Sequence, residues 1–346
     1  MDILGGLMAL SKYVYLILIA IVALGTLPAS AAGYKLIPAI TYQGAPDGSA
    51  AVDVGDGYFI GATDEKANRL TLYSTKEGVE PKPLPLDITK EVNKVLKLDK
   101  IKECDLEGGV KIDDIIYWIG SHGRDSKAEE KKERQVLFAT KINGSGANVT
   151  LEFVGTVYTR LLADLVEHPA LKSFKLDEAA KLAPKEPGAL NIESLAVDGD
   201  KLLIGFRNPI PGGKALIVPL LNPRAMFKDG ASAKLGEPIL LDISGLGLRD
   251  MKSWRGEFLL IGGDFIDRFD KEANPAPKLS KLFRWKGGAD DKPIDLNVKM
   301  GDLNPEAIIV FGKDNDEKVL ILSDDGKYPK ANGNSFRSVW LQEVKE

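Results

Sequence analysis

The stretch of sequence that decides the fold is NIESLAVDGDKLLIGFRNP, which runs from residue 191 to residue 209. Two short apolar segments flank Gly199-Asp200, and such a pair between apolar segments is typical of the tight turn of a β-hairpin. The first segment begins at Asn191-Ile192-Glu193, and the second ends at Arg207-Asn208. The stretch is therefore predicted to be a hairpin whose open end carries charged side chains.

The same layout recurs four more times along the chain, in residues 47–65, 105–124, 248–265 and 304–326. A third apolar or alternating segment follows each hairpin, and a fourth follows several of them. Four strands per unit, repeated about every 60 residues, is the pattern of a β-propeller blade. We count five blades, and a sixth with a degenerate signature remains open. A two-sheet sandwich explains the pattern less well, because it gives no reason for the polar residues to recur at the same phase.

The two ends of the chain indicate how the ring of blades closes. The last unit has no fourth strand after Val344, whereas residues 34–42 (YKLIPAITY) form a spare strand. Pairing the two would remove the exposed edges that an open array leaves. The predicted fold class is thus all-β, a single propeller of four-stranded blades closed by the N-terminal strand. Residues 159–182 are an exception, because their near-helical apolar spacing predicts a short helical insertion near 160–182.

The N-terminus has the features of a targeting segment. Residues 13–25 are an apolar run preceded by Lys12, and Ala29-Ser30-Ala31 matches the small-x-small pattern of a signal-peptidase site. We therefore expect a signal peptide over residues 1–31 and a propeller domain over residues 32–346. A retained anchor is the weaker alternative, since the run is shorter than the ~20 residues that a span needs. The chain is expected to be secreted or periplasmic, with no stable membrane anchor after cleavage.

The composition excludes several classes of protein. With 46 Lys+Arg against 50 Asp+Glu, the net charge of -4 gives no broad basic field, which predicts that nucleic acid is not a partner. The single cysteine, Cys104, cannot form an intramolecular disulfide. Its neighbours Glu103 and Asp105 are expected to raise the pKa of the thiol and to oppose thiol chemistry. We also expect the chain to be a monomer.

The hairpin geometry predicts where the charged residues meet. Residues just before the first strand and just after the second strand of a hairpin lie side by side at its open end. Glu107, Glu193 and Glu306 occupy the same position in three repeats, so their carboxylates are expected to converge on one mouth of the central channel. Together with Asp324, they suit a hard cation such as Ca²⁺ or Mg²⁺.

Basic residues are expected at the same mouth. Arg124 and Arg207, and also Arg249, could hold an anionic group, because a guanidinium binds carboxylate or phosphate in a bidentate manner. His122 is one of only two histidines and is predicted to act as a general acid or base there. The alternative is structural, because loop residues of this kind also tie neighbouring blades together by hydrogen bonds and ion pairs.

Three pairs of short motifs carry a resemblance to a known family. They are Asp105-Leu-Glu-Gly-Gly with Ser121-His122-Gly-Arg124, Asn191-Ile-Glu193-Ser-Leu with Gly205-Phe-Arg207-Asn-Pro209, and Asn304-Pro-Glu306 with Ser323-Asp-Asp-Gly326. In these the chain resembles the domain-of-unknown-function 3616 family, with Ile192-Glu193-Ser194 where that family commonly has Ile-Glu-Gly. The family looks like a distant relative of propellers that include esterase-like phytases and calcium-dependent lactonases. Because the activity of the family is not established, the resemblance implies the fold and the convergence of acidic residues on the mouth of the channel, rather than a reaction.

Two functional hypotheses follow from the sequence. The first is a propeller whose mouth binds, and in an enzymatic form hydrolyses, a small anionic molecule such as a phosphoester. In that hypothesis the glutamates hold a divalent cation, the arginines neutralise the anion and His122 transfers a proton. The second is a non-catalytic scaffold that presents the same face to a protein or a glycan.

Overall fold

Five antiparallel sheets of four strands form in the described part of the chain. The structure, a computed structural model, describes residues 33–62, 68–266, 268–269, 276–313, 316–329 and 333–344. The signal peptide expected over residues 1–31 lies outside them, and secretion and the monomeric state stay predictions. None of the described helices is long and apolar enough to cross a membrane.

Each sheet is one blade, numbered in chain order of its first strand. Blade 1 contains β2 (Ala50–Gly55), β3 (Tyr58–Ala62), β4 (Leu70–Ser74) and β5 (Lys82–Pro83). Blade 2 contains β6 (Leu106–Ile112), β7 (Ile115–Gly120), β8 (Leu137–Asn143) and β9 (Thr150–Tyr158). Blade 3 contains β10 (Asn191–Asp198), β11 (Lys201–Asn208), β12 (Ala215–Leu220) and β13 (Ile239–Leu241).

The remaining two blades follow the same order. Blade 4 contains β14 (Gly247–Trp254), β15 (Glu257–Gly263), β16 (Lys281–Trp285) and β17 (Ile294–Asp295). Blade 5 contains β18 (Pro305–Phe311), β19 (Lys318–Ser323), β20 (Ser335–Val344) and, at its outer edge, β1 (Gly33–Gln43). The predicted propeller of five four-stranded blades is confirmed.

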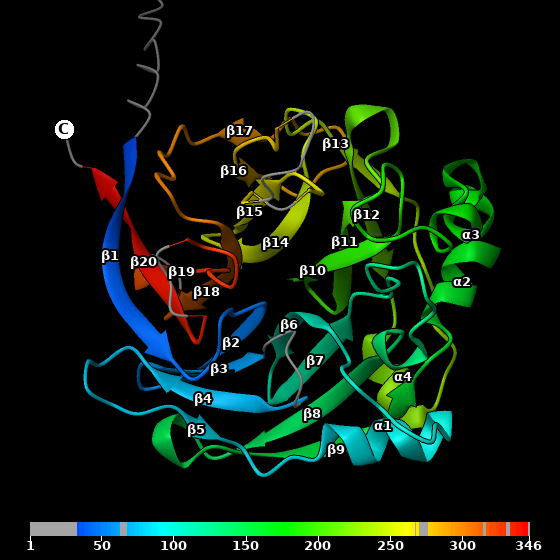
Figure 1. Cartoon of the computed structure of the whole chain (residues 1–346), viewed down its shortest axis with the longest axis horizontal. Coiled ribbons are helices and arrows are strands. Elements are labelled where there is room, and N and C mark those ends of the chain that lie inside the picture. Colours follow the sequence, from blue (N-terminus) through cyan, green and yellow to red (C-terminus); the bar gives the residue numbers. More distant parts are fainter. Residues whose placement is uncertain are drawn as a thin grey trace, which may run out of the picture. The chain divides into compact units, whose positions relative to one another are not determined.

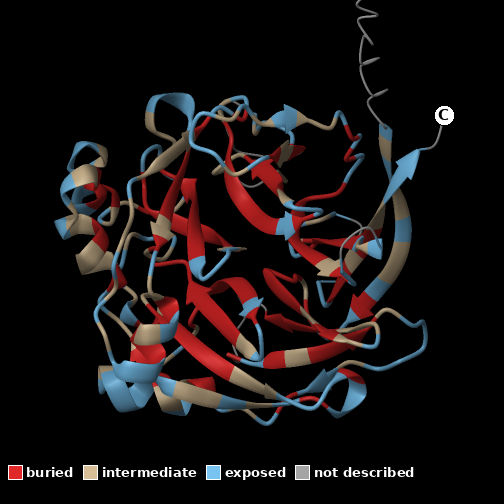
Figure 2. Ribbon diagram, turned by 180° about the vertical axis from the view of Figure 1, so that it is seen from behind, coloured by how far each residue is buried: buried red, intermediate tan, exposed pale blue. Residues whose placement is uncertain are grey.

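The first strand of each repeated hairpin lies innermost in its blade. The strands β2, β6, β10, β14 and β18 contact one another in that order, and β18 returns to β2, so they surround a central axis (Figure 1). These inner strands are buried on both faces, which explains why their sequences are apolar runs interrupted only near their ends. Figure 2 shows the buried residues concentrated in the strands around the axis and the exposed ones in the outer loops.

The N-terminal strand closes the ring as the sequence predicts. β1 pairs with β20 along almost its whole length, from Gly33 opposite Val344 to Gln43 opposite Ser335. The ladder shifts register between Pro38 and Thr41, where Ser338 Oγ accepts a hydrogen bond from Ile40 N at 3.1 Å and donates one to Ile40 O at 2.7 Å. A side chain thus replaces the backbone pairing that the irregularity removes.

Helices lie outside the ring of sheets. The helical insertion predicted near 160–182 is confirmed as α2 (Leu161–Glu167), the 3-10 helix η3 (Pro169–Phe174) and α3 (Leu176–Ala179). Two further helices, α1 (Ile88–Leu96) and α4 (Pro223–Asp229), both contact β9, the outer strand of blade 2. They cover one long strand edge that would otherwise present unpaired backbone groups.

Candidate functional site

A β-bulge recurs near the start of the innermost strand in four of the five blades. The pairing skips one residue between Leu106 and Gly108 in β6, and one residue at the equivalent place in β10, β14 and β18. The residues left out of the ladder are Glu107, Glu193, Arg249 and Glu306. A bulge bends the strand and redirects the side chain of the extra residue, so the repeat places one charged group per blade on the axis.

The four bulge residues line one cavity of about 620 Å³ at the open end of the hairpins. We call this cavity the mouth; its walls also include the loops that carry Asp47, Arg124 and Asp324. All four bulge residues are less than a tenth exposed. In blade 1 the described ladder begins at Ala50 opposite Ala62, so the place equivalent to the bulges is opposite residues outside the described ranges. Burial of charged side chains is costly unless they are paired, so their contacts decide what the mouth can do.

Arginines hold the bulge glutamates of blades 3 and 5. Arg207 Nη1 donates to Glu193 Oε1 at 2.7 Å, which confirms the predicted proximity of these two residues. Arg249 Nη2 donates to Glu306 Oε1 at 2.6 Å, and Arg249 Nε lies 3.9 Å from Glu193 Oε2. Carboxylates of blades 3 and 5 therefore flank a guanidinium of blade 4.

The second oxygen of Glu193 is a buried acceptor at the mouth whose surroundings need an explanation. Glu193 Oε1 accepts hydrogen bonds from Asn191 Nδ2 and from Arg207 Nη1, both at 2.7 Å. Oε2 is buried and accepts no hydrogen bond among the described residues, although the side chain is only 2% exposed. A buried acceptor without a donor is rare in folded proteins and commonly marks a place for a ligand, ion or water.

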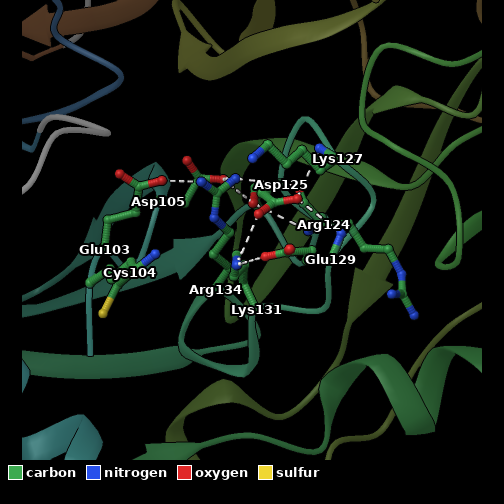
Figure 3. A network of polar contacts seen from close by, with 12 residues as sticks. Glu103, Cys104, Asp105, Arg124, Asp125, Lys127, Glu129, Lys131 and Arg134 are labelled. Atoms are coloured by element: carbon green, nitrogen blue, oxygen red, sulfur yellow. Dashed lines mark hydrogen bonds and ion pairs between the residues drawn. The ribbon is translucent and has the colours of Figure 1, made fainter. Parts of the chain in front are cut away.

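A second ion-pair network lies where blade 2 meets the mouth (Figure 3). Arg134 Nη1 donates to Asp105 Oδ2 at 2.9 Å, and Arg134 Nη2 contacts Glu103. The hydroxyl of Ser121 donates to the same oxygen of Asp105. Burial raises the pKa of Asp105 to about 6, against the opposing effect of the Arg134 charge. Neither Asp105 nor Arg134 is among the site residues predicted from the sequence, although Asp105 begins one of the quoted motifs.

His122 lies outside the mouth, which corrects its predicted position. The imidazole is 1% exposed, its Nδ1 contacts Gly120 O at 2.8 Å, and it does not line the cavity. Burial lowers the pKa of His122 to about 4, so the ring is neutral at pH 7. The backbone of His122 has a left-handed φ of 56°, which turns the side chain inward at the end of β7. Hairpin geometry alone could not foresee this turn.

Arg124 lines the mouth and is held by backbone carbonyls. Its Nε donates to Ala180 O at 2.7 Å and its Nη1 to Ala128 O at 2.8 Å. Within the described ranges, no carboxylate contacts this guanidinium. Arg124 therefore carries a positive charge at the cavity that no ion pair neutralises directly, in contrast to Arg207 and Arg249.

The residues predicted to bind a divalent cation are brought to one cavity. The contacts described for Glu193, Glu306 and Asp324 there are ion pairs and hydrogen bonds with other residues of the protein. Glu107, Glu193, Glu306 and Asp324 all line the mouth. Asp324 accepts hydrogen bonds from Asn304 Nδ2 at 2.9 Å and from Gly326 N at 3.0 Å, as in a turn. In the part of the chain that the structure describes, no three His, Cys, Asp or Glu residues are grouped so that they could hold a metal ion. The cation site stays a prediction.

Some charged residues of the inner strands do act as struts. Lys252 Nζ donates to Asp250 Oδ1 at 2.7 Å and to Leu195 O at 3.3 Å, and Asp250 Oδ2 accepts from Ile308 N at 2.7 Å. This group joins blades 3, 4 and 5 below the mouth. The structural alternative therefore holds for Asp250 and Lys252, which do not line the mouth.

The comparison with protein families agrees with the motifs. The sequence pattern of the protein family of unknown function DUF3616 matches residues 148–332, more than half of the chain. This chain belongs to the DUF3616 family. The matched segment includes the bulges of blades 3, 4 and 5. No curated protein matches the chain in sequence.

Solved structures resemble the fold at low sequence identity. A glutaminyl cyclase of Myxococcus xanthus is 12% identical with a TM-score of 0.44, over 91% of this chain and 99% of its own. The Malassezia sympodialis allergen Mala s 1 is 11% identical with a TM-score of 0.46, over 85% and 92%. A GH43_1 enzyme of Xanthomonas citri, complexed with xylose, is 10% identical with a TM-score of 0.44, over 90% of each chain. Similarities of this size assign no substrate or reaction to the DUF3616 chain.

Proposed function

We propose that the mouth of this DUF3616 propeller binds a small anionic molecule, with a phosphoester as the favoured class. The observation that carries the proposal is the repeated bulge, which brings buried charged side chains from four blades to one cavity of about 620 Å³. Buried charges cost stability compared with apolar residues of similar size, and functional sites in clefts are places where proteins keep them. The cavity volume is in the range of small-molecule sites.

Arg124 is the proposed anchor for the anion. Its guanidinium is oriented by two backbone carbonyls and is not neutralised by a contacting carboxylate among the described residues. A guanidinium held in one orientation loses little entropy when it binds an anion, and its charge strengthens the hydrogen bonds. Arg207 and Arg249 are already engaged with glutamates, so we assign them to the organisation of the site.

Hydrolysis with the help of a divalent cation is the enzymatic form of the proposal. The described lining contains eight Asp or Glu and six Lys or Arg residues, so a divalent cation would offset the surplus charge. Glu107, Glu193, Glu306 and Asp324 are the residues that would hold it. Such a cation would polarise the phosphoryl oxygen. His122 is unsuited to move the proton, because it is buried and does not line the mouth.

A calorimetric titration tests the binding function. Phenyl phosphate and inorganic sulfate are titrated into the whole protein with EDTA present, and again with Ca²⁺ or Mg²⁺ in place of EDTA. We expect Arg124→Gln to weaken phenyl phosphate binding at least tenfold, while Arg160→Gln leaves it unchanged. Arg160 is a matched control because its side chain is 63% exposed and lies outside the mouth. Absence of binding of either anion under all conditions contradicts the proposal and favours the scaffold hypothesis.

A further inference from the structure

The mouth contains two kinds of recognition element, and the anion explains only one of them. Arg124 supplies positive charge at the wall, whereas the described lining as a whole has two more carboxylates than cationic side chains. The surplus lies at the bulges, where three of the four residues are glutamates. A ligand with only an anionic group would be attracted by Arg124 and repelled by the bulge glutamates.

The negatively charged recognition element includes one specific atom, the Oε2 oxygen of Glu193. Glu193 lines the mouth, and its Oε2 is buried and accepts no hydrogen bond within the described ranges. Arg249 Nε lies 3.9 Å from this oxygen, which is beyond hydrogen-bond distance. The guanidinium is drawn away because its Nη2 donates to Glu306 at 2.6 Å. The oxygen is therefore prepared to accept a hydrogen bond from a donor that enters the cavity.

The chemistry of that donor can be argued from the arrangement of the carboxylates. Ca²⁺ needs six to eight oxygen ligands within about 2.6 Å, and Mg²⁺ needs six at about 2.1 Å. No described group of three His, Cys, Asp or Glu residues is suited to hold a metal ion. An ammonium group has three N–H donors that each reach a separate acceptor at about 2.8 Å. It suits carboxylates that are held apart by arginines, and it also offsets the surplus negative charge.

We propose that the ligand of the mouth is a zwitterion, whose anionic group binds at Arg124 and whose ammonium group binds at Glu193 Oε2. The inference rests on the proposed function for its anionic half and adds the cationic half. It names a class of ligand, small aminoalkyl phosphates or related zwitterions, in place of simple anions.

A matched pair of probes tests the inference on the unaltered protein. Phosphoethanolamine and ethyl phosphate share the same phosphate ester, and only the first carries an ammonium group. Both are titrated calorimetrically with EDTA present. We expect phosphoethanolamine to bind at least tenfold more tightly than ethyl phosphate.

Variants then locate the effect. Glu193→Gln should abolish the preference for phosphoethanolamine, so that the two probes bind with similar affinity. Because Glu193 also pairs with Arg207, circular dichroism and the melting temperature check that the variant is folded. Arg124→Gln should weaken both probes by a similar factor, since it removes the shared anchor.

The outcomes separate the two proposals. Equal affinity of the two probes overturns the zwitterion and leaves the anion site intact. Binding of both probes only when Ca²⁺ or Mg²⁺ replaces EDTA also overturns it, in favour of the metal ion. If neither probe binds under any of these conditions, the anion site itself fails and the inference falls with it.

Discussion

Arg249 Nη2 donates a hydrogen bond to Glu306 Oε1 at 2.6 Å, from the bulge of blade 4 to the bulge of blade 5. Both side chains are less than a tenth exposed. The two residues occupy equivalent positions of two repeats, so one arginine in a series of glutamates converts repulsion between blades into attraction. The same guanidinium lies 3.9 Å from Glu193 on its other side. Arg249 thus places a positive charge between the buried glutamates of the two neighbouring blades.

Substitution of Arg249 by glutamine should strongly destabilise the propeller. It would leave Glu193 and Glu306 buried without this cation, and removal of one partner of a buried pair costs about 3–5 kcal/mol. The measurement is the free energy of unfolding in urea. Arg224→Gln is a matched control, because Arg224 also contacts two carboxylates, Asp113 and Asp200, but in an exposed setting. The control should cost much less, because exposed ion pairs contribute little to stability, and similar losses for both variants would contradict the role of Arg249.

Part of this site was predictable from the sequence. The phase of the repeat placed Glu107, Glu193 and Glu306 at equivalent positions, and hairpin geometry placed Arg207 beside Glu193. Both are local consequences of strand pairing. The equivalence of Arg249 was also visible, since Leu248-Arg249-Asp250 stands where Ile192-Glu193-Ser194 does. The bulges themselves were not, because one extra residue in a ladder leaves no signature in residue type.

The neutral, buried state of His122 should make stability depend on pH. Burial lowers the pKa of this imidazole to about 4, whereas an unfolded histidine titrates near 6.5. Between these values the unfolded state binds a proton that the native state does not. The contribution of the neutral imidazole to the free energy of unfolding is therefore complete above about pH 6.5. It is lost as the pH falls toward 4, by up to about 3 kcal/mol.

The test compares the pH dependence of two proteins. Urea unfolding between pH 4 and pH 7 is measured for the native sequence and for His122→Asn, since asparagine tolerates the left-handed φ of 56° at this position. The variant should lose less stability on acidification. His168 is retained in both proteins and cancels in the comparison. Parallel pH profiles would show that His122 titrates normally and is not buried as described.

His122 also shows where reasoning from the sequence ends. The hairpin rule correctly put residues 121–124 at the open end of blade 2, and Arg124 does line the mouth. The direction of each side chain depends on backbone angles of the connecting loop, and Asp105 and His122 both adopt positive φ there. These angles follow from tertiary contacts, such as the hydrogen bond from His122 N to Arg134 O. Residue types alone do not encode them.

Cys104 should be chemically inert in the native protein. Burial raises the pKa of its thiol to about 12, and the carboxylates of Glu133, Asp105 and Glu103 add to the effect, as the sequence predicts. The thiolate is the reactive form, and its population at pH 8 is then negligible. Reaction with Ellman's reagent should be absent in buffer and complete in 6 M guanidinium chloride. Rapid modification of one thiol per native chain would contradict the burial.

The closure of the ring should depend on the hydroxyl group of Ser338. Its hydroxyl contacts both the amide and the carbonyl of Ile40, at the point where β1 and β20 lose their regular register. Ser338→Ala leaves these partly buried backbone groups without that partner, and the loss should be about 1–3 kcal/mol. Ser253→Ala is the matched control, because Ser253 Oγ makes one exposed hydrogen bond, to Val197 O.

Hydrogen exchange should report faster opening of β1 in Ser338→Ala while the amides of blades 2 and 3 keep their protection, because the edge strand opens before the ring does. Uniform loss of protection in all blades would instead indicate that closure and global unfolding are one event, and Ser338 would then have no local role.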